Sequence, residues 1–521
     1  MTAPALAATS PAPSAPRSSP AQRPSPADAD REAPLVKTKI VATVGPACWS
    51  PEGLRGLVEA GVDVFRLNFA HGEHDRLAEV VEEVRRISAA LEKPVALLGD
   101  LSGPKIRLGE LPGDGLQCDL GAMFTFAREA PPSPDEWGDG SVLTCTYECL
   151  LDDLKPGDRV LLADGTVAMR VAEVHEENGR PARADCVVEQ PGLLRSKQGI
   201  NLPGVVLSTP SLTDKDRDDL RFAVRQGLDY VGLSFVRQAA DIRLLREAIE
   251  AHECLHPPQI VAKIEKLEAV DDLENVVAAT DAVMVARGDL GVEADIARVP
   301  VLQKRIIRLC NRHRVPVITA TQMLDSMQED ERPTRAEATD VANAVLDGSD
   351  AVMLSGETAI GRHPRGAVRM MSRIAVEAET DFHFHVAGLR EEASLTRHAA
   401  HPITEAVTEG AVAAAVQLDA ALIVVATHSG KTALSVSGKR SKIPVLALTD
   451  RADSARRMAL YFGVTPIRTD VVSGAPREVM AFVTEWGKKT GALQTGDRVV
   501  LIGSTTWSKK GHDLLVVRQV A

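Results

Sequence analysis

A lysine and two carboxylates stand at the ends of neighbouring β-branched apolar runs in the middle of the chain. Lys263 and Glu265 are two residues apart at the end of one predicted strand, so their side chains point the same way. Asp289 ends the next predicted strand, which would bring a second carboxylate beside Glu265. Two carboxylates that leave room for water and a substrate oxygen are the usual protein ligands of Mg2+. The pattern predicts a magnesium site next to a fixed positive charge.

An alternative without a metal is that each carboxylate forms an ion pair with an arginine or a lysine. For one isolated carboxylate this interpretation would be the better one. Here the pair occurs with Lys263, with Arg66 at the end of an earlier run, and with a glycine-containing turn at 286–293. Glycine lets backbone N–H groups approach an anion, and a helix start after the turn adds dipole attraction. We therefore favour a metal, with a carboxylate or phosphate bound at Gly288 and Asp289.

These side chains can meet only if their strands end on one face of a single sheet. Short apolar runs alternate with helical patterns such as 79–91 along most of the chain. The eight predicted strands are 38–44, 62–69, 94–101, 229–236, 259–265, 282–289, 315–322 and 350–356. Eight strand–helix units in series predict an α/β fold, a (β/α)8 TIM barrel with its active site at the carboxyl ends of the strands.

Two further regions depart from the barrel pattern. Gly and Pro turns with short alternating runs predict an inserted β-rich lid domain, and the end of the chain has an α/β alternation of its own. The predicted divisions are a disordered Ala/Pro/Ser-rich tail at 1–33, barrel at 34–104, lid at 105–198, barrel at 199–384 and a C-terminal α/β domain at 385–521. Since residues 1–27 contain two arginines and no acidic residue, an organellar transit peptide is the alternative for the tail.

The composition excludes several classes of protein. The 521 residues carry a formal net charge of -12 and only 3 % aromatics, so no nucleic-acid partner is expected. No run approaches the roughly 18 apolar residues of a membrane span, and we expect no membrane association and a cytoplasmic location. Seven scattered cysteines fit neither a disulfide framework nor a zinc site, so we expect reduced thiols.

Seven blocks of sequence follow one another in an order typical of one enzyme family. They are 39–46 (KIVATVGP), 65–69 (FRLNF), 263–266 (KIEK), 284–293 (MVARGDLGVE), 319–324 (TATQML), 332–337 (RPTRAE) and 353–358 (MLSGET). Residues 37–376 resemble pyruvate kinases strongly, and the C-terminal domain resembles them more loosely. The resemblance implies phosphoryl transfer from phosphoenolpyruvate to ADP in the last step of glycolysis, a lid after the third strand, a regulatory C-terminal domain and a homotetramer.

The resemblance also implies roles for individual residues. Arg66 and Lys263 would neutralise the phosphoryl oxygens, and Thr321 would act through water beside the carbon that is protonated. Mg2+, with Mn2+ as a substitute, would be held by Glu265 and Asp289, and a second Mg2+ would arrive with the nucleotide. The substrate-binding set is Arg66, Lys263, Gly288, Asp289 and Thr321, and the nucleotide-binding set is Asn68, His71, Arg107 and Lys197. For His71 alone, a structural histidine is an equally good interpretation.

One part of the family pattern is altered. Many pyruvate kinases bind K+ through Asn, Ser, Asp and a backbone carbonyl, followed by a Glu in Gly-Pro-Glu. Asn68, Asp100 and the Leu101 carbonyl match, but Ala70 replaces the Ser and Lys105 replaces the Glu. A fixed ammonium repels a monovalent cation and can stand in for it, so we expect no requirement for K+. The alternative is that Lys105 is only a solvated lysine at the lid hinge.

The C-terminal domain contains a loop at 427–432 (THSGKT) that ends like a P-loop. Val425 stands where a P-loop requires glycine, so the loop is not one. It resembles the family's effector loop, in which Ser429, Lys431 and Thr432 would hold a phosphate of an allosteric effector. The loop at 503–511 does not match the family's sugar-bisphosphate loop, so the effector is open and an absence of activation is the alternative.

Two other functions were weighed against the kinase. A Mg2+-dependent aldolase of the pyruvate or oxaloacetate type also uses a Glu and an Asp on a related barrel, but it needs neither the lid nor the Arg66–Asn68 block. A non-catalytic regulator that binds phosphorylated metabolites finds no support in the sequence, because all five candidate residues are present: Arg66, Lys263, Glu265, Asp289 and Thr321.

Overall fold

The computed structural model describes residues 36–111, 113–129, 142–386, 400–505 and 511–521. The predicted tail at 1–33 lies outside these residues, and the exact domain divisions stay predictions.

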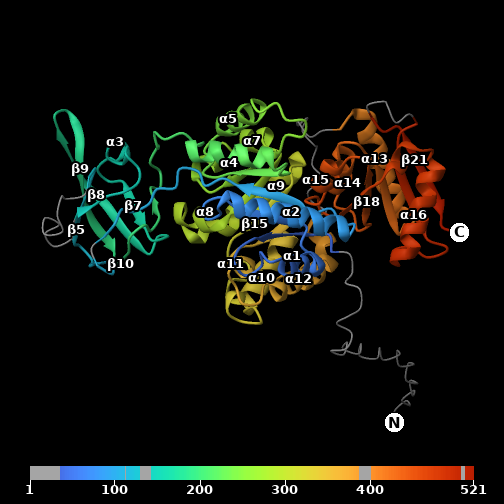
Figure 1. Cartoon of the computed structure of the whole chain (residues 1–521), viewed down its shortest axis with the longest axis horizontal. Coiled ribbons are helices and arrows are strands. Elements are labelled where there is room, and N and C mark those ends of the chain that lie inside the picture. Colours follow the sequence, from blue (N-terminus) through green and yellow to red (C-terminus); the bar gives the residue numbers. More distant parts are fainter. Residues whose placement is uncertain (1–35, 112, 130–141, 387–399, 506–510) are drawn as a thin grey trace, which may run out of the picture. The chain divides into compact units, whose positions relative to one another are not determined.

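The centre of the described chain is a closed barrel of eight parallel strands (Figure 1), which confirms the predicted TIM barrel. Around the barrel the strands follow the order β1-β16-β15-β14-β13-β12-β3-β2. Their bounds are β1 (Lys39–Thr43), β2 (Val64–Asn68), β3 (Ala96–Asp100), β12 (Tyr230–Leu233), β13 (Gln259–Ile264), β14 (Ala282–Ala286), β15 (Val317–Ala320) and β16 (Ala351–Leu354). All eight predicted strands exist. Asn68, Asp100 and Lys263 at their ends are still paired within the barrel, whereas Glu265 follows the last residue of β13.

All eight predicted strands run one to three residues past their observed ends, and the difference matters most at β14. The strand predicted at 282–289 ends at Ala286, and Asp289 lies in the first turn of α8 (Arg287–Glu293). Gly288 and Gly291 belong to the same short helix, so the expected loop before the helix does not exist. The carboxylate of Asp289 still enters the site from the carboxyl end of β14.

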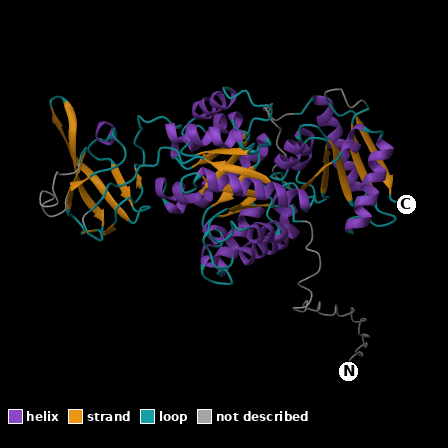
Figure 2. Cartoon of the chain, viewed as in Figure 1, coloured by secondary structure: helices purple, strands orange, loops and turns teal. Residues whose placement is uncertain are grey.

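Helices pack around the outside of the barrel (Figure 2). They are α1 (Pro51–Ala60), α2 (His74–Ala90), α4 (Asp214–Arg225), α5 (Ala239–Glu250), α6 (Leu267–Asp271), α7 (Leu273–Ala279), α9 (Val299–His313), α10 (Arg335–Leu346), α11 (Gly356–Ala359) and α12 (Pro364–Val386), with short 3-10 turns η3 (Ile296–Arg298) and η4 (Asp325–Gln328). On α2 the buried residues recur every three or four positions, at Leu77, Val80, Val81, Val84 and Ile87. This spacing places one apolar stripe against the strands and leaves the charged face in solvent.

The insertion is rich in strands, as predicted, and has a core of its own. Its strands are β4 (Leu116–Cys118), β5 (Met123–Ala127), β6 (Val142–Leu143), β7 (Arg159–Leu162), β8 (Val167–Glu177), β9 (Arg180–Gln190), β10 (Gly192–Leu194) and β11 (Ile200–Asn201), with one short helix, α3 (Leu150–Asp153). They form a two-stranded and a six-stranded sheet.

The C-terminal domain is a sheet in the order β19-β18-β17-β20-β21 with helices α13 to α16. Its elements are α13 (Pro402–Gln417), β17 (Leu422–Ala426), α14 (Lys431–Gly438), β18 (Val445–Thr449), α15 (Ala452–Met458), β19 (Val464–Arg468), η5 (Asp470–Ser473), α16 (Pro476–Thr490), β20 (Arg498–Gly503) and β21 (Leu514–Gln519). The sequence predicted four of these strands and missed β19, which contains Pro466. Proline cannot donate to a strand ladder, and β19 accordingly lies at the sheet edge.

Two global expectations can be compared with the structure. All seven cysteines are free in the structure, and four of them are buried. Within the described ranges no helix is both long and apolar enough to cross a membrane.

Asp216 fastens the start of α4 to the segment through which the chain leaves the barrel for the lid. Its buried carboxylate accepts hydrogen bonds from the backbone N–H groups of Gly103 at 3.0 Å and Thr213 at 2.9 Å. It also accepts from the Thr213 hydroxyl at 2.6 Å, which completes a capping box. Gly103 has a φ of +63°, a conformation that favours glycine. The hydrogen bond from its N–H to Asp216 holds the hinge backbone in this conformation.

We expect Asp216→Ala to lower the free energy of unfolding by about 2–4 kcal/mol, because two backbone N–H groups lose their acceptor. Denaturant unfolding followed by tryptophan fluorescence measures the change. Asp218→Ala is the matched control, since this aspartate lies on the same helix with 62 % of its side chain exposed. The control should change stability by less than about 0.5 kcal/mol. Equal losses in the two variants would contradict the anchoring role.

Candidate active site

The carboxylate of Asp100 lies between two cationic side chains at the carboxyl ends of three barrel strands. Asp100, at the end of β3, is only 1 % exposed. Its Oδ2 lies 2.6 Å from both Nε and Nη2 of Arg66, which comes from β2. Its Oδ1 lies 3.2 Å from Nζ of Lys263, which comes from β13. The structure thus brings together the two residues predicted to neutralise a phosphoryl group, and it gives them a shared counter-ion.

Three oxygen atoms lie within 3.2 Å of the Lys263 ammonium, two in ion pairs and one in a hydrogen bond. Besides Asp100, Nζ lies 3.0 Å from Oε1 of Glu265 and 2.7 Å from Oγ of Ser234. Burial alone would lower the pKa of Lys263, but the charges of Asp100 and Glu265 outweigh burial and raise it. Lys263 is therefore a fixed positive charge rather than a proton donor.

Glu265 and Asp289 form the predicted pair of carboxylates. Glu265 is 1 % exposed, and its Oε2 accepts a hydrogen bond of 2.7 Å from the backbone N–H of Phe235. Burial raises the pKa of Glu265, Lys263 opposes this, and the charge of Asp289 raises the pKa again. Asp289 therefore lies close enough to repel Glu265, and a divalent cation between them would relieve that repulsion.

Glu265 and Asp289 supply too few protein oxygens to complete the coordination of a metal ion. Across the part of the chain that is described, no group of three or more His, Cys, Asp and Glu side chains is arranged to hold a metal ion. Two carboxylates without further protein ligands fit an ion that keeps several waters and binds substrate oxygens, as Mg2+ does.

Thr321 occupies a strained backbone position in the turn directly after β15, next to Gly288 of α8. Its φ is +71°, and that of Gln322 is +51°, values that β-branched and long side chains rarely adopt. The Thr321 hydroxyl accepts from the N–H of Gly288 at 2.8 Å and donates to the carbonyl of Ala320 at 2.6 Å. The predicted substrate residues Gly288 and Thr321 are thus in direct contact, and the Gly288 amide has a partner before any substrate arrives.

Two side chains without a predicted role hold the turn at 320–324 in place. Arg287 donates to the carbonyls of Ala320 at 3.1 Å and Thr321 at 2.7 Å. The buried carboxylate of Glu357 accepts from the N–H of Leu324 at 3.0 Å, and burial raises its pKa. Both residues follow buried strands in the sequence, which was the only signal that could have singled them out.

The predicted nucleotide residues bring further positive charge to the mouth. The pKa of His71 is lowered by burial first and then by the nearby charges of Arg107, Lys105 and Arg66. Arg107 donates from Nη1 to the backbone carbonyl of Lys197 at 3.1 Å. The Lys197 ammonium is exposed and lies 2.8 Å from Glu110. His71 is therefore neutral among three cations at neutral pH.

The groups that matched a K+ site have other partners. Asn68 accepts from the N–H of Ala70 at 3.1 Å through its side-chain oxygen. The Leu101 carbonyl accepts from the Ser234 hydroxyl at 2.7 Å, and Asp100 is paired with Arg66 and Lys263. Lys105 lines one small cavity together with Asp289.

The three residues predicted to bind an effector phosphate do not all face solvent. Ser429 and Lys431 are exposed on either side of Gly430, whose φ of +80° lets α14 begin directly after the loop. Thr432 is buried, and its hydroxyl lies 2.9 Å from Nδ1 of His512.

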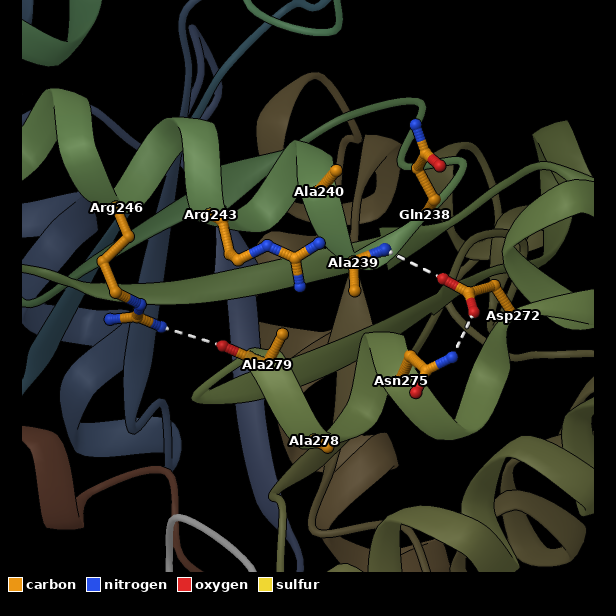
Figure 3. Close-up of a pocket in the computed structure, with 9 residues that line it drawn as sticks. All are labelled: Gln238, Ala239, Ala240, Arg243, Arg246, Asp272, Asn275, Ala278 and Ala279. Carbon is orange, nitrogen blue, oxygen red and sulfur yellow. Dashed lines mark hydrogen bonds between the residues drawn. The ribbon is translucent and has the colours of Figure 1, made fainter.

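A groove of about 670 Å3 between α5 and α7 is separate from this constellation (Figure 3). Arg246 donates to the Ala279 carbonyl at its edge, and Asp272 accepts from the N–H of Ala239. None of the predicted catalytic, metal or nucleotide residues lines it.

Most of the chain is similar to known proteins of one family. Residues 35–368 match the family model described as pyruvate kinase, barrel domain, and residues 405–517 match pyruvate kinase, alpha/beta domain. A pyruvate kinase from Geobacillus stearothermophilus is 40 % identical over 92 % of this chain and 79 % of its own length. One from Clostridium acetobutylicum is 37 % identical over 93 % of this chain and 100 % of its own.

A solved structure supports the same assignment. The crystal structure of a pyruvate kinase from Cryptosporidium parvum superposes with a TM-score of 0.85 and 33 % sequence identity, covering 93 % of this chain and 96 % of that one. The barrel with its inserted sheets, the C-terminal domain and the ordered sequence blocks lead to the same conclusion. The chain belongs to the pyruvate kinase family of phosphotransferases.

Proposed function

We propose that this enzyme transfers the phosphoryl group of phosphoenolpyruvate to ADP, giving pyruvate and ATP, with Arg66 and Lys263 contacting the phosphoryl oxygens. The observation that carries the proposal is the buried carboxylate of Asp100 between these two cations. Phosphoryl transfer needs positioning and neutralisation of the equatorial oxygens, and two fixed cations in one mouth supply both. The family match gives no support to an aldolase or to a regulator without catalysis.

The family implies a divalent metal, and we propose Mg2+ held by Glu265 and Asp289, with Mn2+ as a substitute. When bound, such an ion neutralises oxygens of the substrate phosphate and of the enolate that forms on transfer. Lys263 lies 3.0 Å from Glu265, so its ammonium and the cation would face the same phosphoryl group. The second Mg2+ of the proposal would enter with the nucleotide.

Thr321 and the lid would serve in binding the substrate carboxylate, in protonating the enolate and in binding ADP. The substrate carboxylate would bind at the amides of Gly288 and Asp289 and at the Thr321 hydroxyl. This requires the Gly288 N–H and the Thr321 hydroxyl to leave their present acceptors, Thr321 Oγ1 and the Ala320 carbonyl. Thr321 would also orient the water that protonates the enolate carbon, since a free hydroxyl is a poor acid. The phosphates of ADP would bind among Arg107, Lys197 and Asn68, with neutral His71 as a hydrogen-bonding partner.

We also propose that K+ is not required. The Leu101 carbonyl and the Asn68 side-chain oxygen already accept hydrogen bonds, and Ala70 offers no hydroxyl ligand. Lys105 lies close enough to His71, the neighbour of Ala70 in the chain, for its charge to lower the pKa of that histidine. Its charge can therefore replace that of a monovalent cation there.

We also propose that the enzyme is a homotetramer and that its C-terminal domain binds an effector phosphate. Large exposed apolar side chains lie on η3 and α9 (Ile296, 71 % exposed; Val301, 68 %) and on α13 (Ile403, 54 %), as on surfaces that subunits cover. A homotetramer would show four times the 55.7 kDa chain mass by sedimentation. The exposed pair Ser429 and Lys431, with Thr432 behind them, would bind an effector phosphate, and we expect the enzyme in the cytoplasm.

For the metal, we expect Glu265→Gln and Asp289→Asn each to lower kcat about 10²–10³-fold, because each removes one of two protein ligands and one negative charge. Mn2+ binding followed by electron paramagnetic resonance should weaken in parallel. Asp271→Asn, at an exposed carboxylate on α6, is the control and should leave both quantities unchanged. Unaltered Mn2+ affinity in the two site variants would refute this ligand set.

For the monovalent cation, we expect phosphoenolpyruvate- and ADP-dependent turnover to be the same when K+ is replaced by tetramethylammonium. The double variant Ala70→Ser, Lys105→Glu should lose about 10²-fold in kcat without K+, because a fixed charge has been removed, and K+ should restore part of it. Collapse of the unaltered enzyme without K+ would remove the Lys105 argument and leave the kinase activity in place.

A further inference from the structure

Ser234 joins the carbonyl at the end of one strand to the catalytic lysine of another. It follows β12 directly and is 2 % exposed. Its Oγ lies 2.7 Å from Nζ of Lys263 and 2.7 Å from the carbonyl oxygen of Leu101. An ammonium group only donates and a carbonyl only accepts, so the direction of both hydrogen bonds is fixed. Oγ accepts from Lys263 and gives its single proton to Leu101.

Of the three oxygen atoms around the Lys263 ammonium, only the Ser234 hydroxyl oxygen carries no charge. The other two are carboxylates with further tasks, since Asp100 also binds Arg66 and Glu265 is a proposed metal ligand. A cation at Glu265 would draw its oxygens away from the ammonium. The hydroxyl carries no charge that would attract a metal, so its bond to Lys263 does not compete with metal binding as the bond from Glu265 does.

We propose that Ser234 is a positioning residue that sets the direction in which the Lys263 ammonium points at the transferred phosphoryl group. The inference rests on the proposed contact of Lys263 with that group. The Ser234 hydroxyl accepts one N–H of the Lys263 ammonium. When Glu265 binds the metal, a second N–H of the ammonium is free to point toward the substrate. Arrangements of this kind have to be held within about 0.5 Å to be productive.

The backbone around Ser234 is fixed well enough to do this. A Cβ at Gly103 would lie only 3.0 Å from Cβ of Ser234, so the lid hinge packs directly on the serine. The next residue, Phe235, has a φ of +53° and donates its N–H to Glu265. One short turn after β12 therefore holds Lys263 of β13 through a side chain, and Glu265, which follows β13, through the main chain.

The first test is Ser234→Ala with full kinetics. We expect kcat to fall about 10–100-fold, as for other residues that orient a catalytic group, with the KM for ADP and the affinity for Mn2+ nearly unchanged. Ser234→Cys keeps the size of the side chain but is a weak acceptor, and it should show the same loss. Ser211→Ala is the matched control, because Ser211 is also 2 % exposed and its hydroxyl has no hydrogen-bond partner among the described residues.

A double-mutant cycle with Lys263→Met separates positioning from a general structural role. If Ser234 acts through the lysine, Ser234→Ala has no further effect on the residual turnover of Lys263→Met. The same fold-loss in both backgrounds, or unchanged kcat in Ser234→Ala alone, would overturn the inference. Full activity of Lys263→Met would instead overturn the proposed role of the lysine itself, so the two failures are distinguishable.

Discussion

The ion-pair cluster around Asp100 is the interaction on which the site depends. Burial by itself would raise the pKa of Asp100, but Lys263 and Arg66 hold it below its ordinary value, so the carboxylate stays ionised. Without it, two cations at the ends of β2 and β13 would repel each other in a place where water cannot screen them. Because the barrel places β2 beside β3 and β12 beside both β3 and β13, the hydrogen-bonded strands fix this cluster without help from flexible loops.

The same rigidity supports backbone conformations that would otherwise be unstable. Phe235, Thr321 and Gln322 all have positive φ, and all three follow the last residues of barrel strands. Each such residue costs of order 1–3 kcal/mol and persists only where its surroundings hold it. Phe235 is held through its N–H by Glu265, and Thr321 through its carbonyl by Arg287. The strain is thus located where it aims a donor or a hydroxyl into the mouth.

The sequence predicted the barrel because apolar runs repeat with the period of strands, and it predicted the carboxylate pair because polar residues end those runs. It could not predict Asp100 as a counter-ion, because that role depends on strand neighbours far apart in the chain. Ser234 and Leu101 are separated by 133 residues, and only the pairing of β3 with β12 brings them together. The predicted end of β14 was wrong for a different reason. Helix α8 begins directly after Ala286, and the apolar pattern does not mark the change from strand to helix.

The balance of charge in the mouth explains why a divalent metal and a basic lid suit this arrangement. Arg66 and Lys263 face three carboxylates, those of Asp100, Glu265 and Asp289, so the ionised cluster alone is net negative. An anionic substrate would be repelled from it, whereas a divalent cation reverses the sign. Lys105 and Arg107 then add positive charge close to neutral His71. If K+ is not required, as proposed above, the covalently fixed charge of Lys105 takes the place of that ion, and no equilibrium with a free ion is needed.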